Sequence, residues 1–219
     1  MILDNHEPLY HMMTINIGEK PADEGGATGI CPSDIVYERL RARYPDFVEK
    51  CEKLGVKYTA LLTSVGDTSV GVGRSWMSFF GRDTVEGVEA RMKELGYTWV
   101  WEDDGKTLRT TTPVLPAVKE IPGTTRKVFF NQIVATLNNT RDFAARTGLS
   151  DLPLSDFIRF GDGSELEREP IEYAKTLCDE TAVELGWQAG DVGLLDNFAV
   201  MHARRAFEGT RKVYASLAM

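Results

Sequence analysis

The C-terminal stretch "GWQAGDVGLLDNFAVMHARRAFEGTRKVYASLAM" constrains the fold of this chain more than any other segment. Short apolar runs alternate in it with polar turns, a pattern that predicts paired strands. Upstream, β-rich runs such as "VKYTALLTS" and "YTWVWED" are separated by only a few helical segments. Because strands and helices do not alternate regularly, a parallel βαβ sheet is not expected. We predict an α+β domain built on a β-sandwich or barrel.

The other elements follow from hydrophobic periodicity and from helix-breaking residues. Helices are expected at 33–54, broken by Pro45, at 84–96 and at about 170–185. Strands are expected at 9–17, 56–64, 97–103, 107–115 and 127–134. The glycine-rich "SVGDTSVGVGRSW" lacks the GK[ST] ending of a phosphate-binding loop, so a mobile loop is expected there, with a place over the active site as one option.

Composition limits the classes of partner. The chain has 219 residues, 42% of them hydrophobic, which is enough for a substantial core, so one domain over residues 1–219 is expected. A net charge of −8 disfavours nucleic acid and anionic membrane surfaces as partners. No run is long enough to span a membrane and "MILDNHEPLYHMM" is not a secretory signal, so a cytoplasmic protein is expected. The three cysteines fit neither a disulfide framework nor a metal clip and are expected to be buried, inert thiols.

The C-terminal stretch also carries two residues with distinctive chemistry, His202 and Arg211. If "VGLLDN" and "RKVYASL" are neighbouring strands, these two residues lie near facing strand ends. An imidazole can bind a metal through one nitrogen, and a guanidinium can hold a carboxylate by two parallel hydrogen bonds. Together they predict a site for a metal and a dicarboxylate.

Several motifs occur in an order that resembles one enzyme family. They are "GGAT", "KVFFNQ", "FGDGSELE" and "WQAGDVGLLDNFAVMHARRAFEGTRKV", and they extend from about residue 19 to the C-terminus. The set resembles the TauD/TfdA-type, clavaminate-synthase-like branch of the iron(II)/2-oxoglutarate-dependent dioxygenases. The resemblance implies a double-stranded β-helix, or jelly-roll, core with flanking helices. It also implies Fe(II) and 2-oxoglutarate as cofactors.

The resemblance further implies roles for individual residues. His202 matches the distal histidine ligand of the iron. Arg211 matches the arginine that binds the far carboxylate of 2-oxoglutarate, and Thr28 of "GGAT" matches the threonine that helps to hold this co-substrate. Lys212 would replace Arg211 if the register shifted by one residue.

The N-terminal end departs from the family pattern, which places a His-x-Asp or His-x-Glu pair before the glycine loop. Here His6 and Glu7 are adjacent, and neighbouring residues of a strand point to opposite faces. Both would reach one ion only through a bulge or turn, for which Pro8 offers a local irregularity. Two interpretations stay open: a triad of His6, Glu7 and His202, or a chain without the proximal ligands.

We therefore expect an iron(II)- and 2-oxoglutarate-dependent oxygenase that uses dioxygen to oxidise a C–H bond of a small molecule. The alternative is a non-catalytic jelly-roll protein that binds a ligand or a partner without iron. A third possibility is that an upstream segment carries the proximal ligands. The four tryptophans are expected in the core or at its rim, where one of them would line a pocket.

Overall fold

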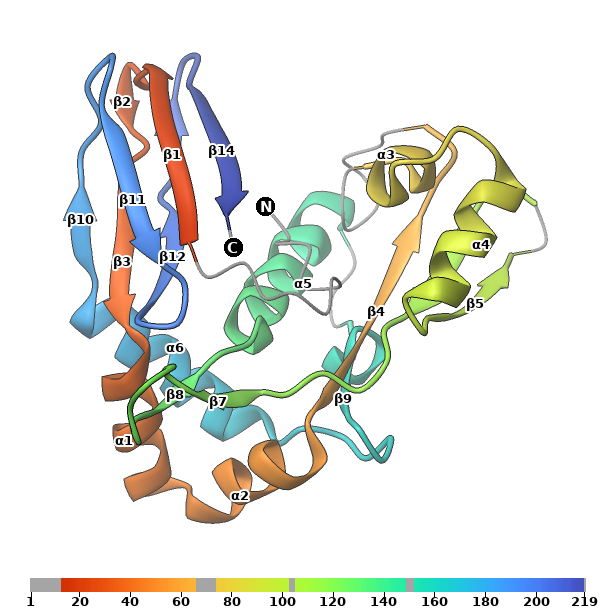
Figure 1. Ribbon diagram of the computed structural model, residues 1–219, viewed down its shortest axis with the longest axis horizontal. Coiled ribbons are helices and arrows are strands. Elements are labelled where there is room, and N and C mark those ends of the chain that lie inside the picture. The colour runs from red at the N-terminus through yellow and green to blue at the C-terminus, as the bar shows by residue number, and fades with distance from the viewer. Residues whose placement is uncertain (1–12, 66–73, 103–104, 149–151, 219) are drawn as a thin grey trace. The chain divides into compact units, whose positions relative to one another are not determined.

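The computed structural model describes residues 13–65, 74–102, 105–148 and 152–218 (Figure 1). It is a mixture of helices and strands, as the sequence predicts. The contacts divide the chain into two compact units, here called unit 1 and unit 2. The described residues of unit 1 are 49–65, 74–102, 105–117, 132–148 and 152–171, and those of unit 2 are 13–48, 118–131 and 172–218. Within the described residues, no helix is long and apolar enough to cross a membrane.

Unit 1 is built on a four-stranded antiparallel sheet in the order β5-β6-β4-β9. Helix α4 begins at an N-cap, Thr84, whose side chain accepts a hydrogen bond from the Gly87 N–H at 3.1 Å. The elements of unit 1 are α2 (Pro45–Leu54, which begins in unit 2), β4 (Val56–Leu62), α3 (Trp76–Phe80), α4 (Val85–Glu94), β5 (Thr98–Trp101), β6 (Leu108–Thr111), α5 (Ile133–Thr147), the 3-10 helix η1 (Leu154–Asp156) and β9 (Ile158–Phe160).

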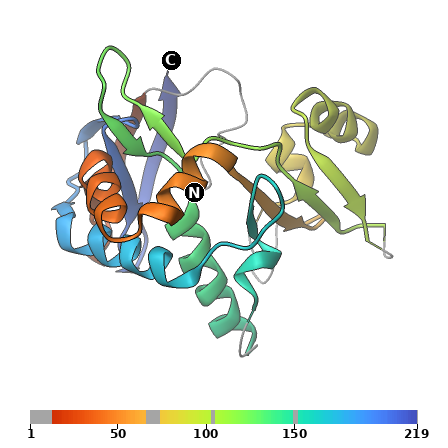
Figure 2. The ribbon, with the colours of Figure 1, turned by 90° about the horizontal axis from the view of Figure 1, so that it is seen from below.

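Unit 2 contains two three-stranded antiparallel sheets, ordered β11-β1-β14 and β10-β3-β12, whose strands overlap in the view of Figure 1. In each, an N-terminal strand lies between two C-terminal strands. Helix α1 packs against the short hairpin β7-β8, as the view in Figure 2 shows. The elements are β1 (Met13–Lys20), β2 (Glu24–Gly25), β3 (Thr28–Pro32), α1 (Ser33–Arg43), β7 (Val118–Glu120), β8 (Lys127–Phe129), α6 (Arg168–Thr181, which begins in unit 1), β10 (Val183–Leu185), β11 (Val192–Asp196), β12 (Val200–Arg204), β13 (Phe207–Glu208) and β14 (Lys212–Ala218).

The sheet β11-β1-β14 has one buried and one exposed face. Asn16 and Leu195 are buried, whereas Ile17 and Leu194 are 45% and 58% exposed. Successive side chains of a strand point to opposite faces, so these values follow the period of two. The inner face is the one that faces the candidate site described below.

Four expectations about the elements are corrected. The segments "VGLLDN" and "RKVYASL", expected to be neighbouring strands, are β11 and β14, and β1 lies between them and pairs with both. The strand expected over 127–134 ends at Phe129, and helix α5 begins at Ile133. The helix expected to reach 185 ends at Thr181, because Val183–Leu185 pairs with β3 instead. The first strand, expected over 9–17, is described from Met13 and continues to Lys20.

The expectations for the cysteines and tryptophans can also be compared with the structure. Cys31 and Cys51 are buried, whereas Cys178 is partly exposed, and all three are free thiols. Trp76 is buried in the core of unit 1. The glycine-rich loop expected to be mobile lies largely outside the described residues.

Candidate functional site

Strand pairing in unit 2 places His202 and Thr28 on one face of a sheet. Strands β12 and β3 are antiparallel, with His202 opposite Ile30 and Arg204 opposite Thr28. Directly opposite residues point to the same face, as do residues two apart on a strand. His202 therefore lies on the same face as Thr28, about 7 Å further along the strand direction.

The imidazole of His202 is partly buried on this face. Burial disfavours the charged form and lowers the pKa of His202 below its ordinary value. Burial therefore favours the neutral form of this side chain. A neutral imidazole has a free nitrogen lone pair and is the form that binds a metal.

The hydroxyl of Thr28 is buried and hydrogen-bonded. Thr28 is only 7% exposed, and its Oγ1 accepts a hydrogen bond from the indole Nε1 of Trp187 at 2.9 Å. Trp187 follows β10, which is the other neighbour of β3. The three strands thus bring together residues from both ends of the sequence.

Arg211 lies over the glycine pair that precedes Thr28. Its Nε donates to the Gly26 carbonyl oxygen at 3.1 Å, and Gly26 has a φ of 71°. A Cβ at Gly26 would lie 3.1 Å from Arg211 Cδ, so only glycine leaves space for this packing. The "GGAT" turn therefore positions both Arg211 and Thr28.

Arg211 is partly buried and lies near a second guanidinium, that of Arg204. Burial, together with the nearby Arg204, lowers the pKa of Arg211 from its ordinary value. Arg204 in turn lies over the ring of Phe207, with its Cζ 4.7 Å from the ring centroid. Within the described part of the chain, no carboxylate forms an ion pair with Arg211. The site therefore suits an anionic ligand.

Lys212, the alternative to Arg211, is directed elsewhere. Its Nζ donates to the Glu19 carboxylate at 3.0 Å, and its side chain is 53% exposed. This ion pair joins the first residue of β14 to β1. The geometry favours Arg211 over Lys212 as a carboxylate ligand.

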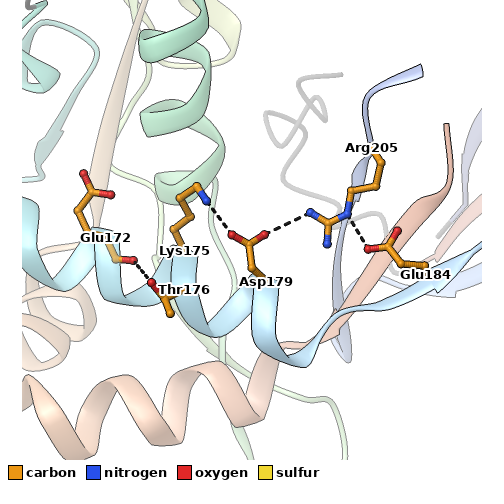
Figure 3. A network of polar contacts seen from close by, with 6 residues as sticks. All are labelled: Glu172, Lys175, Thr176, Asp179, Glu184 and Arg205. Carbon is orange, nitrogen blue, oxygen red and sulfur yellow. Dashed lines mark hydrogen bonds and ion pairs between the residues drawn. The ribbon is translucent and has the colours of Figure 1, made fainter. Parts of the chain in front are cut away.

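A second arginine holds the end of β12 from the opposite face of the sheet (Figure 3). Arg205 donates through Nε to Glu184 at 2.6 Å and through Nη1 to Asp179 at 3.2 Å, and Lys175 bonds Asp179 at 2.7 Å. The Arg205 backbone N–H also donates to the Ala27 carbonyl at 2.9 Å. Arg205 thus ties β12 to α6 and β10.

The remaining predicted ligands, His6 and Glu7, lie outside the described residues. Among the residues that the structure describes, no group of three or more His, Cys, Asp or Glu side chains could hold a metal ion.

The contact between Trp187 and Thr28 is not predicted by the sequence. The two residues are 159 positions apart, and no local pattern indicates their contact.

Comparison with known proteins gives a consistent family assignment. A model of the "Taurine catabolism dioxygenase TauD, TfdA family" matches residues 17–217. A clavaminate synthase-like protein of Arabidopsis thaliana is 36% identical over 195 residues, which are 88% of this chain and 56% of that protein. The dapdiamide synthesis protein DdaC of Enterobacter agglomerans is 25% identical over 212 residues, which are 94% of this chain and 58% of that protein.

Two solved structures are similar to this chain. One, from Burkholderia xenovorans, is described as an alpha-ketoglutarate dependent 2,4-D dioxygenase, with a TM-score of 0.48, 14% identity and coverage of 96% of this chain and 62% of the other. The second is AAD-2 in complex with Mn(II) and N-oxalylglycine, with a TM-score of 0.47, 14% identity and coverage of 98% and 65%. The chain spans little more than half the length of its curated relatives. The family model, which covers nearly the whole chain, shows that it belongs to the TauD/TfdA dioxygenase family.

Proposed function

We propose that the chain is an iron(II)- and 2-oxoglutarate-dependent oxygenase that oxidises a C–H bond of a small molecule with dioxygen. Family membership supports the reaction class. The observation that carries the proposal is the meeting of three predicted residues around one end of β3. Thr28 lies on that strand, His202 shares its face and Arg211 covers the turn before it.

The described residues fit the co-substrate. 2-Oxoglutarate is a dianion with a carboxylate at each end, and Arg211 offers a planar, permanently charged donor with a second guanidinium, that of Arg204, nearby. Thr28 adds a buried hydroxyl. We propose that Arg211 binds the far carboxylate and that Thr28 helps to orient the same molecule.

The described residues also offer one metal ligand. Burial favours the neutral form of His202, which would bind Fe(II) through one nitrogen, with His6 and Glu7 as the further candidates in the proposed triad. When bound, the metal would activate dioxygen and couple the decarboxylation of 2-oxoglutarate to oxidation of the substrate. The protein itself would position both molecules and limit the access of water.

We also propose that the two sheets of unit 2 form a jelly-roll. Their antiparallel order, in which β1 and β3 each lie between two C-terminal strands, supports this architecture. A single domain over the whole chain and a cytoplasmic location stay predictions.

The proposal is tested by anaerobic titration of the protein with Fe(II) and 2-oxoglutarate. A competent site should develop a weak visible charge-transfer band, and succinate should form when oxygen and a substrate are added. His202→Ala should abolish the band because it removes a metal ligand. No band and no succinate from the unmodified protein would contradict the proposal and favour the non-catalytic alternative.

The role of Arg211 has a matched control in its neighbour. Arg211→Ala should weaken 2-oxoglutarate binding strongly, whereas Lys212→Ala should leave it nearly unchanged, since Lys212 bonds Glu19. The reverse result would move the carboxylate site to Lys212. Equal effects of both substitutions would show that the binding depends on net charge alone.

A further inference from the structure

The hydrogen bond between Trp187 and Thr28 determines in which direction the Thr28 hydroxyl can donate. Leu185 of β10 is opposite Thr28 of β3, so Trp187, two residues later, reaches back over the start of β3. Its indole Nε1 donates to Thr28 Oγ1 at 2.9 Å. This bond joins Thr28, which the proposed function places at the co-substrate, to Trp187, which has no role in that proposal.

The indole is held in place from the other sheet. A Cβ built at Gly18 would lie 3.0 Å from Cε3 of Trp187, and one built at Gly193 would lie 3.1 Å from Cη2. Gly18 lies on β1 and Gly193 on β11, so the ring rests on two adjacent strands whose backbones offer no side chains there. A larger residue at either position would push the indole away from Thr28.

The chemistry of the two groups decides which way the hydrogen bond runs. An indole N–H is only a donor, whereas a threonine hydroxyl has one hydrogen and two acceptor lone pairs. Thr28 therefore accepts from Trp187 and cannot donate to it. Among the residues that the structure describes, Thr28 donates to no acceptor. Its hydrogen is left for an acceptor outside the described residues, and a carboxylate is a strong acceptor.

We propose that Trp187 is a positioning residue that holds the Thr28 hydroxyl as a donor toward a carboxylate of 2-oxoglutarate. The inference rests on the proposed function. Trp187 does not touch the co-substrate in this account and acts only through Thr28. The pair therefore contributes to co-substrate affinity as a unit, and loss of the indole N–H leaves the hydroxyl free to rotate.

The first test is Trp187→Phe, which keeps an aromatic ring against Gly18 and Gly193 and removes the N–H. Binding of 2-oxoglutarate to the Mn(II)-loaded protein would be measured by calorimetry. We expect binding to weaken by up to about fivefold, the limit reached if the Thr28 hydroxyl loses its one hydrogen bond to the carboxylate when the indole N–H is removed. Trp101→Phe is the matched control, since its Nε1 donates to Glu89 in unit 1 at 2.8 Å. It should leave the affinity unchanged.

A double-mutant cycle separates positioning through Thr28 from a general structural effect. Thr28→Val should weaken binding by itself, and Trp187→Phe in that background should weaken it no further. Thr28→Ser keeps the hydroxyl and should bind within about twofold of the unmodified protein. This variant keeps the test informative if Trp187→Phe does not fold.

Each outcome decides a different question. Unchanged affinity in Trp187→Phe, additive losses in the cycle, or Thr28→Ser binding as weakly as Thr28→Val would each overturn the inference. A flat titration of the unmodified protein would instead overturn the proposed function, and the inference with it. Thermal unfolding of every variant would confirm that the comparison is made between folded proteins.

Discussion

Replacing Gly26 by alanine should loosen Arg211 and weaken co-substrate binding. Gly26 has a φ of 71°, and a Cβ there would lie 3.0 Å from Ala22 Cβ, 3.1 Å from Arg211 Cδ and 3.2 Å from Phe207 Cβ. All three neighbours would have to give way. The Arg211 side chain is the most flexible of them, so its guanidinium should move.

The magnitude has two separable parts. The left-handed conformation costs an alanine about 1–2 kcal/mol. Forcing a methyl group between packed neighbours costs a further ~1–3 kcal/mol, as overpacking usually does. Gly123 supplies a control because its φ is 75° and nothing lies within 4 Å of its Cβ position. Gly123→Ala therefore carries only the first cost.

Urea unfolding and calorimetric titration with 2-oxoglutarate measure the two consequences. Gly26→Ala should lose about 1–3 kcal/mol more unfolding free energy than Gly123→Ala. It alone should also bind 2-oxoglutarate about tenfold more weakly, a change of about 1.4 kcal/mol. Equal destabilisation by the two substitutions, or an unchanged affinity in Gly26→Ala, would refute the role of this glycine.

Three further substitutions test other contacts. Arg205→Gln should cost no more than about 1 kcal/mol of unfolding free energy, and less at high salt, because its ion pairs with Asp179 and Glu184 join side chains that are 40–46% exposed. Burial lowers the pKa of Lys119 to about 8 although its Nζ lies 4.2 Å from the Phe130 ring centroid, so Lys119→Met should raise stability near pH 7 by at most about 1 kcal/mol after allowance for partial exposure and for the lost cation–π contact, as urea unfolding would show. Gly161→Ala should cost about 3 kcal/mol or more, measured in the same way, because its Cβ would overlap the Leu54 carbonyl oxygen.

The pH dependence of the Lys119 variant has a definite sign. Below about pH 8 the folded protein carries a charge that burial disfavours, and between about pH 8 and 10 the unfolded chain binds more protons at Lys119 than the folded one. The stability of the unmodified protein should therefore rise over this range, and the advantage of Lys119→Met should shrink. A pH-independent advantage would contradict this account. For Arg205→Gln, a loss of unfolding free energy that does not change with salt would contradict the role given to its ion pairs.

The missed elements show where local patterns are insufficient. Ile133, Leu137 and Thr140 are buried at helical spacing in α5, yet the preceding "KVFF" suggested that a strand continued through 134. Val183–Leu185 follows α6 after a single residue, and its apolar residues continued the expected helix. Pairing with β3 gives this short segment its strand conformation. A partner so distant in sequence overrides a weak local preference.

The sequence by itself determined the mixture of helices and strands, the order of the family motifs and the residue types suited to a metal and a dicarboxylate. Such features are local, because side-chain chemistry and turn geometry depend on neighbouring residues. Only the tertiary structure decided that Trp187 bonds Thr28 from 159 positions away, and that Lys212 bonds Glu19 while Arg211 covers Gly26. Strand register sets these contacts, and register is fixed by the packing of whole sheets, which no short pattern encodes.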